Sequence, residues 1–312
     1  MIDFTRGNCM EQFWLTDEIS GERIPVTVLH GNLPGKTGLI TAGLHNCEYV
    51  GVAATTILAN TLKPEEIRGT VILAHSCDYS GFLAHGNDKT LEDGEDVNHF
   101  FPGDESGTAT QKLAAFIRKE LLEISDFVVD LHSGGFNESL VPHCYYQATS
   151  GEASQVSFQM AQCTDIRCAV QVSTRRGLYS WCPTVGIPAI LLERGESGLI
   201  HPGEPEAAAE DVENILRYMG CLDDGVPPKR YDVPVITKAY YLEADVDGCW
   251  FPVYKPGVQF EKGVLLGEIR DIFGNLLRSV WAEEPGLVLY QTESLAIAKG
   301  EITVAYAAWQ DA

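Results

Sequence analysis

The stretch that decides the fold runs from residue 39 to residue 75 and reads LITAGLHNCEYVGVAATTILANTLKPEEIRGTVILAH. It opens with a short apolar run over Leu39–Leu44, typical of a buried strand, and Tyr49–Leu62 follows with apolar residues at helical spacing. The helix stops before Lys63-Pro64, because proline cannot continue a helix, and Thr70–His75 is a second β-rich run. The order of strand, helix and strand predicts a parallel or mixed sheet covered by helices.

The same alternation extends on both sides of this stretch, from about residue 24 to residue 220. Further strands are expected at Ile24–His30, Phe127–Leu131, Cys144–Ala148, Cys168–Ser173 and Ala189–Glu193, and further helices at Thr108–Ile124, Glu152–Cys163 and Glu204–Met219. The strands are short and apolar without alternation, which fits a sheet that is covered on both faces. We therefore predict an α/β fold with a mixed, largely parallel sheet and helices on both of its faces.

The character of the sequence changes after residue 222. Asp223-Asp-Gly-Val-Pro-Pro228 resembles a linker, and from Tyr231 onward only short strands separated by Pro-Gly, Lys-Gly and Phe-Gly turns follow. These strands are expected at Val233–Tyr241, Gly248–Phe251, Gly257–Phe260, Leu265–Ile269, Gly286–Tyr290 and Glu301–Ala307. The pattern predicts an α/β domain over residues 1–225 and a small all-β domain over residues 226–312, which we expect to line the entrance of a site or to contact another copy in a homo-oligomer.

Charge and hydropathy exclude two classes of partner. Acidic residues outnumber basic ones 44 to 22, which gives a net charge of −22 at pH 7. Nucleic acids and anionic membrane surfaces attract clustered Lys and Arg, so neither is expected as a partner. No window approaches the roughly 18 apolar residues of a membrane-spanning helix.

The nine cysteines predict a reducing compartment. Their number is odd and none forms a C-x-x-C pair, so they match neither a disulfide framework nor a zinc ribbon. They are expected to be reduced, mostly buried thiols. The opening MIDFTRGNCMEQFWLTDE lacks the basic start and apolar segment of a secretory signal. We therefore expect a cytoplasmic protein.

Polar residues with metal-binding chemistry follow the ends of two predicted strands. His45 and Glu48 lie three residues apart after the strand that ends near Leu44, a spacing that lets an imidazole and a carboxylate converge. Alone, this pair also fits a helix N-terminus with a favourable acidic residue. A second strand ends on His132, and Asp130 before it is placed to orient an imidazole or to play a buried structural part. Two His and one carboxylate with a fourth position open for water form a common catalytic zinc site.

A third strand ends on Glu193 and is followed by glycine, in the segment GIPAILLERG over residues 186–195. A carboxylate beside a zinc site can accept a proton from the water that the metal acidifies and pass it to a leaving amine. A strand-end salt bridge is the alternative for Glu193 alone. The polar loop GEDVNHFFPG over residues 94–103 has no decisive meaning by itself.

Taken in order, four motifs resemble the succinylglutamate desuccinylase and aspartoacylase branch of the zinc carboxypeptidase superfamily. They are GLHNCE at 43–48, DVNHFFPG at 96–103, DLHSG at 130–134 and GIPAILLERG at 186–195. They follow the order of the family's G-x-H-G-x-E, D-L-N-R-x-F-P-G, strand-end D-L-H and G-I-P followed by the catalytic Glu, with Asn46 in place of the Gly after the first His. The resemblance covers roughly residues 20 to 225, and the C-terminal β-rich part is similar to the small β domain of that branch.

The resemblance implies a site and an activity. One Zn²⁺ ion would be bound by His45, Glu48 and His132. Glu193 would be the general base and acid, and Asn98 would hydrogen-bond the carboxylate end of the substrate. The implied function is a zinc-dependent hydrolase of an amide bond, most simply one that deacylates an N-acyl amino acid or a related small molecule.

Alternatives stay open. The chain is also compatible with a carboxypeptidase-type peptide hydrolase or a non-catalytic metal-binding relative. A thiol enzyme that uses Cys47 or Cys182 is a further alternative.

The arginines of the family pattern are missing here. His99 replaces the Arg that follows the motif's Asn, and no Arg lies between Arg68 and Arg118. Histidine grips a carboxylate less well than the bidentate, always charged guanidinium. Substitutes for binding a substrate carboxylate are expected among His99, Arg175, Arg176 and Arg194.

Overall fold

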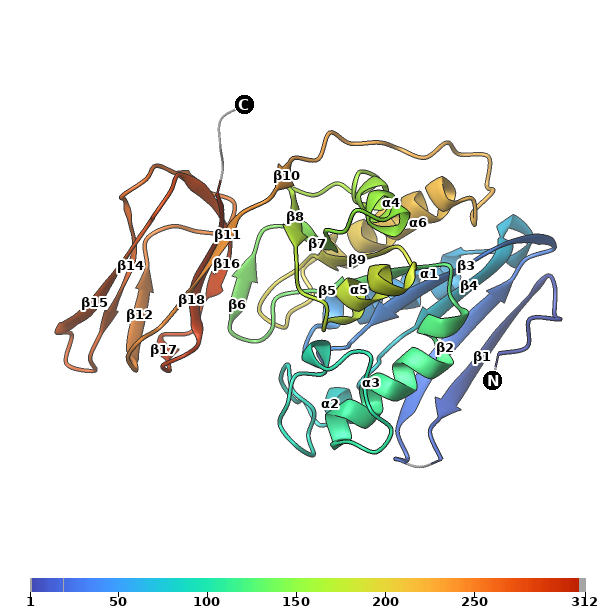
Figure 1. Ribbon diagram of the computed structural model, residues 1–312, viewed down its shortest axis with the longest axis horizontal. Coiled ribbons are helices and arrows are strands. Elements are labelled where there is room, and N and C mark those ends of the chain that lie inside the picture. The colour runs from blue at the N-terminus through green and yellow to red at the C-terminus, as the bar shows by residue number, and fades with distance from the viewer. Residues whose placement is uncertain (1, 19, 309–312) are drawn as a thin grey trace.

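The computed structural model describes residues 2–18 and 20–308. An α/β body holds the helices and the main sheet, and a module made only of strands lies beside it along the long axis of the molecule (Figure 1). The chain passes from the body into the module after β10, near residue 236.

The main sheet has nine strands in the order β1-β2-β4-β3-β5-β9-β7-β8-β10. Its strands are β1 (Cys9–Thr16), β2 (Arg23–His30), β3 (Leu33–Ala42), β4 (Arg68–Ala74), β5 (Phe127–His132), β7 (His143–Gln147), β8 (Ala169–Val172), β9 (Ala189–Glu193) and β10 (Val235–Ile236). The β3–β4, β3–β5, β5–β9, β7–β8 and β8–β10 pairs are parallel. The β1–β2, β2–β4 and β7–β9 pairs are antiparallel. The prediction of a mixed, largely parallel sheet is confirmed.

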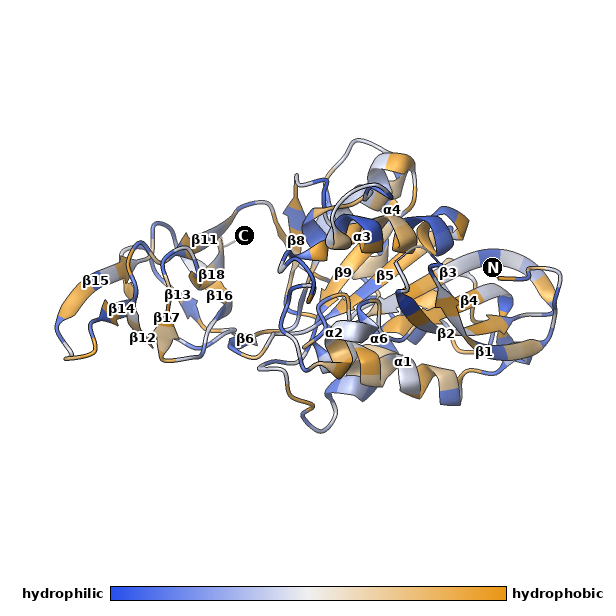
Figure 2. Cartoon of the chain, turned by 90° about the horizontal axis from the view of Figure 1, so that it is seen from below, coloured by the Kyte–Doolittle hydropathy of each residue, from blue (hydrophilic) through white to orange (hydrophobic). Residues whose placement is uncertain are grey.

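Helices cover both faces of this sheet, as predicted. They are α1 (Tyr49–Thr61), α2 (Tyr79–Leu83), α3 (Ala109–Glu120), α4 (Glu152–Ala161), α5 (Leu178–Trp181) and α6 (Glu204–Met219), with short 3-10 turns at Pro64–Glu66, Val97–His99, Leu122–Ile124 and Cys182–Val185. Helices α3 and α5 pack in one buried cluster, and α1, α4 and α6 pack in a second. Neighbouring residues of β5 belong to different clusters, Val128 to the first and Val129 to the second, because strand side chains alternate between faces. The central strands β5 and β9 are strongly hydrophobic (Figure 2).

The strand-only module is held together by its own core. Its strands are β11 (Ala239–Glu243), β12 (Gly248–Pro252), β13 (Gln259–Phe260), β14 (Leu265–Arg270), β15 (Leu276–Trp281), β16 (Gly286–Thr292), β17 (Ala296–Ile297) and β18 (Ile302–Ala308). They form antiparallel sheets that enclose Trp250 and Tyr306. The module is joined to the body by β6 (Glu138–Leu140), which pairs with β16. The boundary at residues 225 and 226 stays a prediction, and β10 extends the main sheet beyond it.

One strand of the main sheet has no counterpart among the predicted elements. β1 pairs with β2 along its whole length but lies at the sheet edge, where most of its residues are exposed or half-buried. An edge strand therefore lacks the continuous apolar run that marked the central strands. Among the described residues, no helix combines the length and the apolar character needed to cross a bilayer.

Candidate metal centre and active site

The candidate residues meet at one edge of the main sheet because three neighbouring parallel strands end there. His45 lies in the turn after β3, His132 is the last residue of β5, and Glu193 is the last residue of β9. His132 and Glu193 are direct partners in the register of β5 and β9. The carboxyl ends of parallel strands are where α/β proteins place their sites.

A tight turn between β3 and α1 positions His45 and Glu48. Gly43 has a φ of +59°, in the left-handed region that favours glycine. The backbone amide of Glu48 donates to the carbonyl of His45 over 3.2 Å. Helix α1 begins at Tyr49, where the sequence predicted it, so His45 and Glu48 both precede the helix. The side chains converge because of this turn, and Glu48 occupies the N-cap position.

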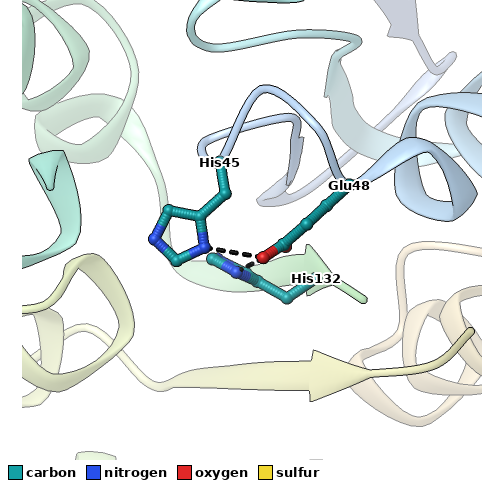
Figure 3. Close-up of side chains that lie close together, drawn as sticks. All are labelled: His45, Glu48 and His132. Carbon is teal, nitrogen blue, oxygen red and sulfur yellow. Dashed lines mark hydrogen bonds and ion pairs between the residues drawn. The ribbon is translucent and has the colours of Figure 1, made fainter. Parts of the chain in front are cut away.

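His45, Glu48 and His132 form a compact group (Figure 3). Nδ1 of His45 lies 2.7 Å from Oε1 of Glu48, and Nδ1 of His132 lies 2.9 Å from Oε2 of the same carboxylate. One ligand atom from each of the three residues can be chosen so that all lie within 4.8 Å of one another. The two rings stand nearly perpendicular, at 87°. Both imidazoles thus direct the same nitrogen toward one carboxylate.

The far nitrogens of both rings are held by a second pair of carboxylates. Nε2 of His132 lies 3.1 Å from Oδ2 of Asp130, and Nε2 of His45 lies 3.0 Å from Oδ1 of Asp96. The hydroxyl of Thr41 donates to Asp130 over 2.7 Å. Contact with an imidazole was one of the roles that the sequence left open for Asp130. The role of Asp96 was missed, because its place in a loop motif gave no sign of which side chain it would face.

The charges of this group are strongly interdependent. Burial by itself would raise the pKa of Glu48, but the neighbouring His45 and His132 outweigh it and lower the pKa. Burial would lower the pKa of His132, but the charges of Asp130 and Glu48 raise it to about 10. Burial would likewise raise the pKa of Asp96, but its hydrogen bond and charge interaction with His45 lower this pKa to about 2. These opposed pKa shifts favour protonated imidazoles beside ionised carboxylates when no metal is bound.

The residues fit a divalent cation. Two imidazole nitrogens and one carboxylate form the donor set that zinc prefers in catalytic sites. Their outer nitrogens are fixed by carboxylates, the usual arrangement around metal-binding histidines. An ion between the three ligands would take the place of the shared protons. The carboxylates of Glu48, Asp96 and Asp130 contact the two imidazoles. Their negative charges also suit a doubly charged ion.

Glu193 lies beside this group and lacks a partner for one of its oxygens. Its Oε2 atom is buried and has no hydrogen-bond partner among the residues that the structure describes. Burial, and then the charge of Glu48, raise the pKa of Glu193 to about 7. A carboxylate with these properties is suited to exchanging a proton near neutral pH.

The candidates for substrate recognition are dispersed. Oδ1 of Asn98 accepts from the backbone amide of Leu178 over 2.8 Å, so this side chain helps fix the start of α5. His99 is three-quarters exposed and lies 3.4 Å from Asp96. Arg175 and Arg176 are exposed in the loop before α5 and form no ion pair within the part of the chain that the structure describes. The backbone amide of Phe101 donates to the carbonyl of Arg176 over 2.9 Å, which joins the two loops.

Arg194 is committed elsewhere. Its guanidinium is 2.7 Å from Asp211 of α6 and donates to the backbone carbonyl of Asp165 over 2.8 Å. The residue is only 7% exposed. Although Arg194 follows Glu193 in sequence, its Nε and Nη2 atoms are engaged by Asp211 and by the carbonyl of Asp165.

Both cysteines of the thiol alternative carry protonated sulfur. Cys47 and Cys182 are buried. Burial, and then the charge of Glu48, raise the pKa of Cys47 to about 11, and burial raises the pKa of Cys182 still further. Because the thiolate is the nucleophile, neither cysteine is activated.

Several polar residues around Glu193 were missed by sequence reasoning. His143 of β7 is the direct partner of Glu193 in the antiparallel register of β7 and β9. Burial, and then the neighbouring Tyr290 and Tyr241, raise the pKa of Tyr145, and Tyr290 of β16 stacks on His143. These residues lie far apart in the sequence and form no local motif. The strand-only module therefore contributes aromatic side chains to the surroundings of Glu193.

Comparison with known proteins now identifies the family. The model of the succinylglutamate desuccinylase/aspartoacylase catalytic domain matches residues 34–219, more than half of the chain. The chain belongs to this family. The matched range includes His45, Glu48, His132 and Glu193.

This chain is similar to a curated enzyme and to several solved structures. N-alpha-acetyl-L-2,4-diaminobutyric acid deacetylase of Halomonas elongata is 38% identical over 119 residues, which cover 38% of this chain and 34% of that protein. The match thus spans about a third of the length of this relative. The product-bound ectoine utilization protein EutE (DoeB) of Ruegeria pomeroyi has a TM-score of 0.86 at 24% identity, covering 99% of this chain and 98% of that chain. A succinylglutamatedesuccinylase/aspartoacylase of Rhodobacter sphaeroides has a TM-score of 0.84 at 24% identity, with the same coverage. These structures share the fold.

Proposed function

We propose that the protein is a zinc-dependent amidohydrolase that removes the acyl group from an N-acyl amino acid or a related small molecule. His45, Glu48 and His132 would hold one zinc ion, and Glu193 would act as general base and acid. The observation that carries the proposal is the convergence of two Nδ1 atoms on Glu48, 2.7 and 2.9 Å away, beside a carboxylate with an unpartnered buried oxygen.

The reaction requires an activated water and a proton carrier. When bound, zinc would supply the acidification of a water and the polarisation of the substrate carbonyl. Oε2 of Glu193 would accept the proton of the attacking water and later deliver it to the leaving amine. The raised pKa of Glu193 supports this exchange, since a catalytic group works best with a pKa near the working pH. Asp130 and Asp96 would keep both imidazoles oriented.

Deacylation is favoured by family membership and by the deacetylase among the relatives. Asn98 and His99, on the loop that also carries Asp96, would contact the substrate. Arg175 and Arg176, on the adjoining loop, would contribute to binding a substrate carboxylate. All nine cysteines are free and most are buried, which supports the proposal of a reducing, cytoplasmic location.

Metal analysis combined with hydrolysis of a panel of N-acyl amino acids tests the function. We expect one zinc per chain in the wild type and loss of hydrolysis on chelation, with recovery on adding zinc. His132→Ala should lose both zinc and activity, whereas His201→Ala, at an exposed histidine of another loop, should lose neither. Stoichiometric zinc in His132→Ala, or hydrolysis that resists chelators, would overturn the assignment.

A further inference from the structure

Glu138 lies where the loops that follow two strands of the site come together. The loop after His132 and the loop after Glu193 are joined by a hydrogen bond from the amide of Gly134 to the carbonyl of Gly195, 3.0 Å long. The amide of Ser197 donates to the carbonyl of Glu138 over 2.8 Å. These bonds fix Glu138, at the start of β6, next to the ends of both β5 and β9.

The side chain of Glu138 has no counterion. It forms no hydrogen bond or ion pair within the described residues, although it is half-buried. Burial raises the pKa of Glu138 well above its ordinary value, and the charges of Glu193 and Glu48 raise it further. The same surroundings include Tyr290, whose pKa is raised by burial and by the charge of Glu138.

A second, independent group nearby also lacks a donor. His143 is fully buried, and its Nδ1 lies 2.7 Å from the backbone carbonyl of Val141. A carbonyl only accepts, so Nδ1 carries the hydrogen and Nε2 presents a lone pair. This lone pair has no partner in the described part of the chain. His143 is cross-strand partner to Glu193 and stacks on Tyr290 at 11° between the ring planes. Two buried acceptor atoms, Oε2 of Glu193 and Nε2 of His143, are therefore left without donors among the described residues.

Over residues 2–18 and 20–308, no arginine forms an ion pair with Glu138. Arg194 is paired with Asp211, and the exposed Arg175 and Arg176 are absent from the groups that set the pKa of Glu138. His45 is the one cation in that set, and it is already held by Glu48 and Asp96. A second carboxylate on the substrate would be repelled here, whereas an ammonium group with its three donors would satisfy the free acceptors.

We propose that Glu138 is a specificity-determining residue that binds a cationic amino group of the substrate. The preferred substrates are then N-acyl amino acids whose side chain ends in an ammonium group, and dicarboxylic ones are rejected. This inference rests on the proposed deacylase function and names the substrate class of the same site.

Paired substrates that differ only in charge test the inference. In N-α-acetyl-L-2,4-diaminobutyrate the side chain ends in an ammonium, and in N-acetyl-L-norvaline a methyl of similar size replaces it. We expect zinc-loaded wild type to favour the cationic member in kcat/KM by at least about tenfold, the lower end for a hydrogen bond to a charged group. Glu138→Gln, which keeps the shape and removes the charge, should lower this ratio by a similar factor. Glu261→Gln, the same change at an exposed glutamate of the β13–β14 turn, should leave the ratio as it is.

Calorimetric binding of the free amino acids, 2,4-diaminobutyrate and norvaline, separates this inference from the proposed function, because it needs no turnover. Selective binding of the diamino acid that disappears in Glu138→Gln supports the cation site, even if no acyl amino acid is hydrolysed and the deacylase function fails. Hydrolysis with equal efficiency for both substrates, or a preference that survives in Glu138→Gln, overturns the inference and leaves the deacylase function standing. If the protein shows neither hydrolysis nor selective binding, both the deacylase function and the cation site are overturned.

Discussion

The two sides of the boundary between β5 and β9 differ in how their polar groups are satisfied. On the β5 side, each ring nitrogen of His45 and His132 faces a carboxylate, and both oxygens of Glu48 are engaged. On the β9 side, Oε2 of Glu193 and Nε2 of His143 are buried without partners. Most buried polar groups in proteins are hydrogen-bonded, so the second side is the exception that calls for an explanation.

The difference indicates two separate tasks. The paired side is arranged by the protein itself, through contacts that would hold the ligands in place for an ion. Each unpaired group on the other side costs about 1–3 kcal/mol in desolvation, a cost that a substrate with suitable donors would offset. The polar contacts on the first side are made within the protein. Under the proposed function, the substrate would supply the missing contacts on the second side.

The same chemical change on each side should have different consequences. Glu48→Gln should lose zinc and reduce hydrolysis to background, because it removes a ligand charge. Glu193→Gln should keep zinc and lower kcat by about 10²- to 10⁴-fold, the usual contribution of a general acid–base group. Elemental analysis and steady-state kinetics measure both. Near-normal turnover in Glu193→Gln would show that the proton takes another route, and loss of zinc there would abolish the distinction between the sides.

Changes to the carboxylates behind the ligands should have the next largest effect. Asp130→Asn should weaken zinc binding by about 10- to 100-fold, as is typical when the partner of a metal-binding histidine is lost. Asp96→Asn should have the smaller effect, because Asp96 is half-buried whereas Asp130 is fully buried. Competition with a chromophoric chelator gives both affinities. Asp271→Asn, at an exposed turn of the strand-only module, serves as the control and should bind zinc normally.

Zinc affinity should rise with pH. In the metal-free protein the pKa of His132 is raised to about 10, mainly by Asp130 and Glu48 against the effect of burial, so this ring is protonated at neutral pH. Zinc needs the neutral ring and must displace the proton, so apparent affinity should increase about tenfold per pH unit for each proton released. Titrations between pH 6 and 8 in buffers of different ionisation enthalpy count these protons. An affinity independent of pH would contradict the proton-held arrangement of the empty site.

The exposed arginines should matter least. Arg175→Ala and Arg176→Ala should each raise KM for a carboxylate-bearing substrate by at most about fivefold, because an exposed ion pair contributes roughly 0.2–1 kcal/mol. The carboxamide of the same substrate should be affected less, since it lacks the charge. Lys299→Ala, which removes an exposed charge from the strand-only module, is the matched control. A much larger effect on KM would show that the loop closes over the substrate and buries the arginine.

Local patterns in the sequence were sufficient for the central part of the fold and for the polar residues at the ends of its strands. The apolar runs over Phe127–His132 and Ala189–Glu193 each lie in the sheet as β5 and β9, and their polar last residues meet at its edge. Edge strand β1 was missed because exposure on its faces removes the apolar signal. The start of α1 at Tyr49 was predicted, but the turn between β3 and α1 that brings His45 and Glu48 together cannot be derived from their spacing alone.

By itself, the sequence determined which residue types end the strands, since hydrophobic period, turns and motifs are encoded within windows of a few residues. Only the tertiary structure decided the partners: Asp96 for His45, 51 residues away, Asp211 for Arg194, and His143 opposite Glu193. These pairings depend on strand order and register, which an apolar strand specifies only weakly, because any similar strand could lie beside it. The unpartnered acceptors around Glu193 arise in the same way, from the antiparallel entry of β7 next to β9 and the pairing of β6 with β16.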